Sequence, residues 1–148
     1  MKSVYIETSI PSFYYDVRSE PEMLARRNWT RQWWARCRHA FSLCVSDAVD
    51  DELASGDFPN KSKALSLIRN LPRLRIVPAI ANIVDVYVRN KVMPRDPEGD
   101  ALHLALASYH KCDFLLTWNC KHLANASLRL FVPTLVTPLE LMTQEGPQ

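Results

Sequence analysis

Three carboxylates and one amide lie where the sequence predicts that apolar segments end or begin: Glu7, Glu52, Asp100 and Asn119. If the fold brings them together, the carboxylates repel one another and raise one another's pKa unless a cation neutralises them. Oxygen ligands with hydroxyl groups nearby and no imidazole suit Mg²⁺ or Mn²⁺ rather than zinc. In proteins these ions activate water and clamp a phosphate during phosphodiester hydrolysis. The four side chains therefore favour a divalent-metal site with that chemistry.

Each acid taken alone has a simpler explanation. Asp100 is a suitable helix cap, and Glu52 has the usual place of a solvated helix residue, like its neighbour Asp51. Glu7 is harder to explain in this way, because Glu is a poor strand residue and this one closes an apolar strand. The metal-site interpretation depends on the residues meeting at one edge of a sheet.

The elements that must position these side chains follow from short apolar runs and helical spacing. Strands are predicted at residues 3–7, 43–45, 74–77, 114–117 and 134–136. Helices are predicted at 20–40, from a cap at Ser46 or Asp47, at 60–70, 79–91 and 100–110, and in a short tail after the last strand. Strands that alternate with helices favour a parallel sheet covered on both faces. Ligands of such sheets bind beyond the carboxyl ends of the strands.

Composition limits the class of protein. The chain has 148 residues, of which 47% are hydrophobic and 23% charged, so it is typical of one globular domain spanning residues 1–148. No run approaches the roughly 18 apolar residues of a membrane span, and the first residues do not resemble a secretory signal. Four cysteines in such a chain indicate reduced thiols. We expect a cytoplasmic protein that does not enter a membrane.

Four ordered motifs resemble those of PIN domains. They are Val4-Tyr5-Ile6-Glu7-Thr8-Ser9-Ile10-Pro11-Ser12, Val45-Ser46 with Glu52-Leu53, Asp100-Ala101-Leu102-His103-Leu104-Ala105, and Leu115-Leu116-Thr117-Trp118-Asn119. The sequence is most similar to the VapC-like branch, with ETSI in place of the usual DTS, and the resemblance covers essentially the whole chain. It implies an α/β fold with three layers, α/β/α, around a mostly parallel sheet of about five strands.

The resemblance also implies an activity: an Mg²⁺- or Mn²⁺-dependent endoribonuclease, commonly the toxin of a toxin–antitoxin pair and commonly a homodimer. Glu7, Glu52 and Asp100 match the three metal-binding acids of the family. Asn119 falls at the fourth acidic position, or His122 does if the loop is aligned differently. An amide orients a water molecule or ligates an ion but does not neutralise a second metal. This departure leaves open an alternative, a catalytically weakened PIN-like module that binds RNA or a protein partner without cleavage.

A basic segment precedes the second predicted strand. Residues 23–46 contain five arginines and no acid. Three of these, Arg27, Arg31 and Arg38, are placed on one face of the predicted helix, and we call them the arginine set. We predict that they contact RNA phosphates or an acidic partner. The tryptophans of the same helix are assigned to packing.

Two other groups of residues are weaker candidates for a site. The pairs His110-x-Cys112 and Cys120-x-His122 flank one predicted strand, but structural zinc sites usually space their cysteine pairs by two to four residues. His103 lies one turn after Asp100, within reach of a carboxylate or a water. A buried histidine bonded to backbone explains it equally well, so it is not included in the predicted site.

Overall fold

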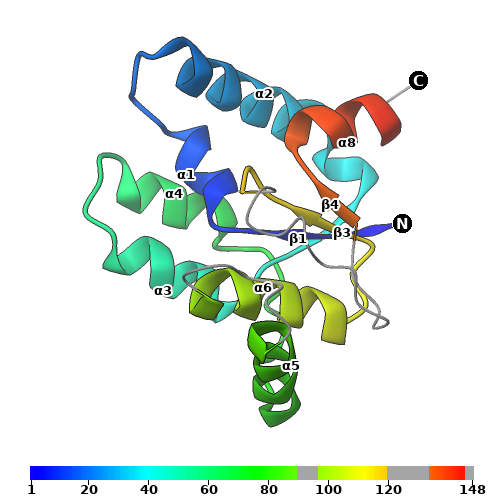
Figure 1. Cartoon of the computed structure of the whole chain (residues 1–148). Helices are drawn as coiled ribbons and strands as arrows, with labels where there is room; N and C mark the ends of the chain where they lie inside the picture. Colours follow the sequence, from blue (N-terminus) through cyan, green and yellow to red (C-terminus); the bar gives the residue numbers. More distant parts are fainter. Residues whose placement is uncertain (90–96, 120–133, 146–148) are drawn as a thin grey trace.

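The computed structural model describes residues 1–89, 97–119 and 134–145 (Figure 1). Its strands are β1 (Ser3–Ile6), β2 (Ser42–Cys44), β3 (Phe114–Leu116) and β4 (Thr134–Val136). Its helices are α1 (Ser9–Tyr14), α2 (Pro21–Cys37), α3 (Asp47–Ser55), α4 (Lys61–Ile68), α5 (Pro78–Arg89), α6 (Pro97–Tyr109) and α8 (Pro138–Glu145). A turn of 3-10 helix, Arg38–Ala40, follows α2. The predicted alternation of strands and helices is confirmed.

The strands form one parallel sheet in the order β2-β1-β3-β4. Val4 of β1 is paired with Leu43 on one side and with Phe114 on the other. All three apolar residues of β1, from Val4 to Ile6, are completely buried. A strand with neighbours on both edges and helices on both faces has no access to water, which explains its continuous apolar run.

The prediction of a strand at residues 74–77 is wrong. Within the described ranges the sheet has four strands, and this segment contributes only an isolated parallel bridge between Val45 and Arg73. The bridge consists of Val45 N–H donating to Pro72 O at 2.9 Å and Leu74 N–H donating to Val45 O at 2.8 Å. β2 ends at Cys44, so only one further residue is available as a partner, and the segment turns into α5 at Pro78.

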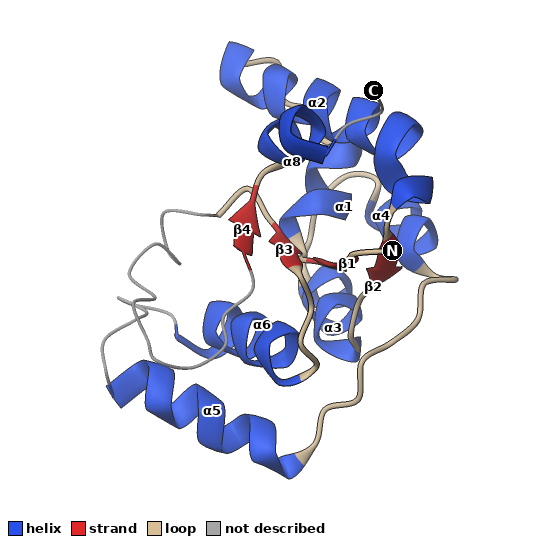
Figure 2. Ribbon diagram, turned by 90° about the vertical axis from the view of Figure 1, so that its right-hand side faces the viewer, coloured by secondary structure: helices blue, strands red, loops and turns tan. Residues whose placement is uncertain are grey.

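The helices form a layer on each face of the sheet (Figure 2). α1, α2 and α8 lie on one face and α3 and α6 on the other, with α5 outside α6. α6 is apolar nearly all round because it packs between the sheet and α5: its residues from Leu104 to Ser108 are all buried. The prediction that this helix is covered on both sides is confirmed. None of the helices in the described ranges has the length and apolar character that a membrane span requires.

The connection from α6 into β3 is tight. Cys112 N–H donates to Ala107 O at 2.9 Å and Lys111 N–H donates to Ser108 O at 3.1 Å, which is the Schellman pattern of a helix C-terminus. The residue that carries the left-handed conformation is Lys111, with a φ of 56°, where glycine is usual. This turn leads directly into the strand that borders the candidate site.

Aromatic side chains fasten α2 to the sheet. Trp33 is completely buried and stacks on Phe41 with ring centroids 6.0 Å apart, and Phe41 meets Phe114 of β3 edge-on at 6.1 Å. Trp34 is also buried and lies against Tyr14 of α1. For Trp33 and Trp34, the assignment to packing is confirmed.

Candidate metal centre

Glu7 lies directly after the central strand and is almost completely buried, with 3% of its surface exposed. Ser9 Oγ and Thr117 Oγ1 donate hydrogen bonds to Glu7 Oε1 at 2.5 and 2.6 Å. The same two hydroxyl oxygens accept backbone N–H bonds from Trp118 and Asn119, both at 2.9 Å. The ends of β1 and β3 are therefore tied together around a buried carboxylate.

Glu52 reaches the same place from α3. The helix begins at Asp47 immediately after β2, so its second turn lies beside the carboxyl end of β1. The Glu52 side chain is 40% exposed, and its Oε1 accepts a hydrogen bond from the imidazole Nε2 of His103. Asp51, its neighbour on the helix, is exposed.

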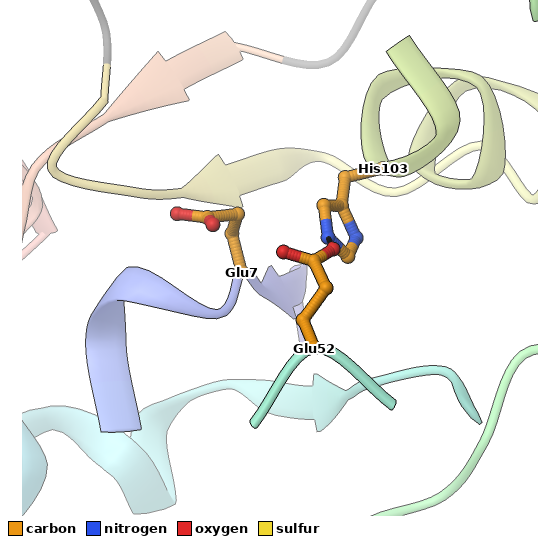
Figure 3. Close-up of side chains that lie close together, drawn as sticks. All are labelled: Glu7, Glu52 and His103. Carbon is orange, nitrogen blue, oxygen red and sulfur yellow. Dashed lines mark hydrogen bonds and ion pairs between the residues drawn. The ribbon is translucent and has the colours of Figure 1, made fainter. Parts of the chain in front are cut away.

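His103 completes the cluster from α6 (Figure 3). Ligand atoms of Glu7, Glu52 and His103 all lie within 4.8 Å of one another. His103 is 1% exposed, and its Nδ1 is hydrogen-bonded to the hydroxyl of Tyr5 at 2.6 Å. Of the two interpretations of His103, the hydrogen bond to a carboxylate is confirmed, and its exclusion from the predicted site was wrong.

The donor set fits a divalent cation. The buried carboxylate of Glu7 and the partly exposed carboxylate of Glu52 converge here, and no Lys or Arg of the described ranges forms an ion pair with either of them. Burial of a carboxylate beside another carboxylate costs free energy that a bound cation offsets. The two carboxylates suit Mg²⁺ or Mn²⁺. The expectation that the cluster contains no imidazole is wrong, since His103 lies beside both carboxylates.

The two remaining predicted residues, Asp100 and Asn119, are close in sequence to residues of this cluster or to residues that contact it. Asp100 is in the first turn of α6, three residues before His103, and its side chain is outside the described residues. Asn119 is half-buried two residues after Thr117, and its backbone N–H donates to the hydroxyl that holds Glu7. His122, the alternative for the fourth position, also lies outside the described residues.

Two members of the arginine set, Arg31 and Arg38, lie against aromatic residues of the α1–α2 layer. Arg31 is over the ring of Tyr14 at 5.2 Å and donates Nε–H to Tyr14 O at 2.7 Å. Arg38 is over the ring of Trp34 at 5.0 Å, and the Nε of Arg27 is buried. The sequence did not single out Arg26, which stacks over Trp118 at 5.6 Å and so lies beside the loop that follows β3.

Of the four residues of the zinc alternative, the structure describes His110 and Cys112, and these two have different partners. His110 Nε2 faces the carbonyl oxygen of Arg75 at 2.8 Å, whereas Cys112 Sγ is 3.8 Å from Cys44 Sγ in the core. The hydrogen bond to Cys112, together with burial, raises the pKa of the Cys44 thiol, so it stays protonated at neutral pH. Cys120 lies outside the described residues.

Solved structures with the same fold are known, although no protein-family model and no curated protein sequence matches the chain. VapBC2 from Rickettsia felis, bound to a DNA fragment from its promoter, contains a chain that matches with a TM-score of 0.58 and 14% sequence identity. The match covers 91% of this chain and 98% of that chain. A chain of FitAcB from Neisseria gonorrhoeae matches with a TM-score of 0.55 and 14% identity, over 93% and 99% of the two chains.

At this level of identity the likeness is one of fold. The chain has the PIN-like α/β/α fold that its motifs predict, with Glu7 and Glu52 brought together at the carboxyl edge of the parallel sheet. Ligands of open parallel sheets bind at this edge.

Proposed function

We propose that this chain is a metal-dependent endoribonuclease, the toxin of a type II toxin–antitoxin pair, with Mg²⁺ or Mn²⁺ as its ion. The observation that carries the proposal is the convergence of Glu7, Glu52 and His103 within 4.8 Å at the sheet edge, in a chain with a PIN-like fold. Asp100 is proposed as the third acid, since it lies one helical turn before His103 on the backbone of α6.

In this proposal each group of the chain has a stated task. A divalent ion bound at this cluster would supply Lewis-acid chemistry, polarising the scissile phosphate and lowering the pKa of water. Glu7, Glu52 and Asp100 hold the ion, and the hydroxyls of Ser9 and Thr117 fix the Glu7 carboxylate. Asn119 orients the attacking water, and the arginine set binds RNA phosphates away from the cluster. Attack of this water on phosphorus would form one P–O bond and break the bond to the 3′ oxygen of the neighbouring nucleotide, which would leave with a proton from solvent.

The test is cleavage of a mixed RNA pool by the purified protein with Mg²⁺, with Mn²⁺ and with EDTA. We expect cleavage with metal and none with EDTA. Asp100→Asn and Glu52→Gln should abolish it while the far-UV circular dichroism stays unchanged. Asp51→Asn is the matched control, because Asp51 is an exposed acid on the same helix turn as Glu52. Full cleavage by Asp100→Asn would remove Asp100 from the site.

A specific feature supports the second candidate, a PIN-like module that binds RNA or protein without cutting. Asn119 has an amide where the family resemblance places a fourth acid. RNA binding that persists in EDTA, together with no cleavage under any metal, would favour this module over the nuclease.

The partner implied by the proposal is an antitoxin. The names VapBC2 and FitAcB each denote a complex, and the VapC-like motifs of this chain suggest the same arrangement here. Co-expression with the adjacent gene should give a stable complex that does not cut RNA. An antitoxin complex that cuts at the full rate would contradict inhibition by occlusion of the site.

The homodimer is part of the same proposal, and light scattering on the purified chain tests it.

A further inference from the structure

A row of buried hydrogen bonds lies behind the exposed carboxylate of Glu52. Ser46 Oγ is 2.8 Å from the Tyr5 hydroxyl, and that hydroxyl is 2.6 Å from His103 Nδ1. The other ring nitrogen of His103, Nε2, contacts Glu52 Oε1. The members come from the central strand, from the residue before α3 and from α6, and Ser46, Tyr5 and His103 are each no more than 1% exposed.

The proton positions in this row follow from its members. The Tyr5 phenol has a single proton to donate. A neutral imidazole has one donor and one acceptor nitrogen. If the Tyr5 hydroxyl donates to Nδ1, the ring proton is on Nε2 and is donated to the Glu52 carboxylate. The Ser46 hydroxyl in turn donates to the Tyr5 oxygen, so every bond in the row runs in one direction, toward Glu52.

The Glu52 carboxylate depends more on an outside hydrogen-bond donor for its position than the Glu7 carboxylate does. Glu7 is 3% exposed and is fixed by two hydroxyl groups. The Glu52 side chain is 40% exposed on a helix surface, and fixing a flexible Glu side chain costs about 1.5–2 kcal/mol of rotamer entropy. In the described residues His103 is its hydrogen-bonded side-chain partner. The carboxylate is thus placed by α6 and β1 rather than by its own helix.

We propose that Tyr5 and His103 are positioning residues that hold the Glu52 carboxylate in place for the metal ion, with Tyr5 acting through His103. The inference rests on the metal site of the proposed function and adds to it two residues that bind neither the ion nor the RNA. Outer partners of metal ligands contribute affinity by orienting those ligands, and their loss typically weakens metal binding by about 10- to 100-fold. Loss of the Tyr5 hydroxyl should have an effect at the lower end of this range, since it acts through one intermediate.

The test measures Mn²⁺ affinity by electron paramagnetic resonance of free Mn²⁺, without RNA. Tyr5→Phe removes one hydroxyl from the row. Tyr87→Phe is the matched control, because Tyr87 is also completely buried and its hydroxyl donates to Ser108 Oγ at 3.0 Å, in the interface between α5 and α6. We expect Tyr5→Phe to weaken Mn²⁺ binding about 10-fold and Tyr87→Phe to leave it unchanged, while both lower the melting temperature of the metal-free protein.

Two substitutions of His103 complete the test. His103→Leu removes the donor and should weaken Mn²⁺ binding about 10- to 100-fold. His103→Gln, whose amide nitrogen lies near the position of Nε2, should restore most of the loss. Equal effects of Tyr5→Phe and Tyr87→Phe on Mn²⁺ affinity would overturn the inference. A ¹⁴N coupling to bound Mn²⁺ that His103→Leu abolishes would also overturn it, because His103 would then be a ligand itself.

This experiment separates the inference from the nuclease proposal. Mn²⁺ affinities that follow the expected order, in a protein that does not cut RNA, would support the positioning role and contradict the nuclease. RNA cleavage with Mn²⁺ affinity that is insensitive to Tyr5 and His103 would do the opposite. Absence of Mn²⁺ binding by the unmodified chain would overturn both.

Discussion

Replacing Glu7 by glutamine should make the metal-free protein more stable. The ligand atoms of Glu7 and Glu52 lie within 4.8 Å of each other, and two charges at that distance repel by about 3.5 kcal/mol at an effective dielectric constant of about 20. Glu52 is 40% exposed, so screening by solvent reduces this repulsion to about 1–2 kcal/mol. The substitution also removes the desolvation cost of a buried charge, which is several kcal/mol.

Weaker hydrogen bonds offset part of this increase in the free energy of unfolding. In the Glu7→Gln variant the amide oxygen would still accept the two hydroxyl bonds from Ser9 and Thr117, but bonds to a neutral amide are weaker than bonds to a carboxylate, by about 1 kcal/mol each. The net change in the free energy of unfolding is an increase of about 1–3 kcal/mol. For a domain of 148 residues this corresponds to a rise in melting temperature of about 2–12 °C.

When metal is added, the unmodified chain should melt at a higher temperature than Glu7→Gln, which reverses their order in the metal-free state. Mn²⁺ at a concentration of about 100 times its dissociation constant stabilises the unmodified chain by about 2.7 kcal/mol, and Glu7→Gln should lose most of this gain. Differential scanning fluorimetry in EDTA and in Mn²⁺ measures both effects, with Asp51→Asn as the control for removal of an acid away from the cluster. A variant that melts lower than the parent in EDTA, or that keeps the full stabilisation by Mn²⁺, would refute the reasoning.

Three further predictions concern other parts of the fold. Lys111→Gly should raise the free energy of unfolding by about 1 kcal/mol in denaturant titrations, because the residue has a φ of 56° that glycine adopts without strain; a decrease would mean that the Lys111 side chain stabilises the turn. The hydrogen bonds from Arg18 hold the pKa of Asp16 below its ordinary value. That stabilisation is present above the unfolded pKa of about 3.9 and is lost as the pH falls through the lower folded pKa, so Asp16→Asn should lower the melting temperature at pH 7 and have little effect at the acid end of a pH series. Alanine in place of the arginine set, in a Glu7→Gln background, should weaken RNA binding and flatten its salt dependence by about 0.7 slope units per lost contact; an unchanged slope would assign these residues to a protein partner or to packing.

Much of the fold could be predicted from local patterns in the sequence. The strands β1 to β4 are short apolar runs, and α2, α4, α5 and α6 have helical spacing, so each was recognisable without tertiary information. The strand expected at residues 74–77 was not recognisable as a loop, because a short apolar run between two prolines is compatible with both. Whether such a run pairs depends on the length of its neighbour, which here ends at Cys44.

The candidate site could be predicted in part. Glu7 and Glu52 are brought together because parallel strands end at one edge of the sheet, which is a property of the topology. His103 was noted for its spacing from Asp100 but not included, since a helix that is apolar on all sides does not show which polar residue faces the strand ends. The roles of Tyr5 and Thr117 depend on contacts over separations of 98 and 110 residues, and no local pattern contains that information.

The place of β1 in the sheet has a consequence for the order in which the site is made during translation. β1 emerges first, but it occupies the interior of the sheet and needs β3 along one of its edges. The hydroxyl of Thr117 that fixes Glu7 is synthesised 110 residues after the carboxylate that it holds. At about 5–20 residues per second, this gap lasts roughly 5–20 seconds. During that interval the growing chain already contains Glu7 and then Glu52 but has no assembled centre. If the chain is the ribonuclease proposed above, it should stay inactive on the ribosome that makes it until β3 joins the sheet.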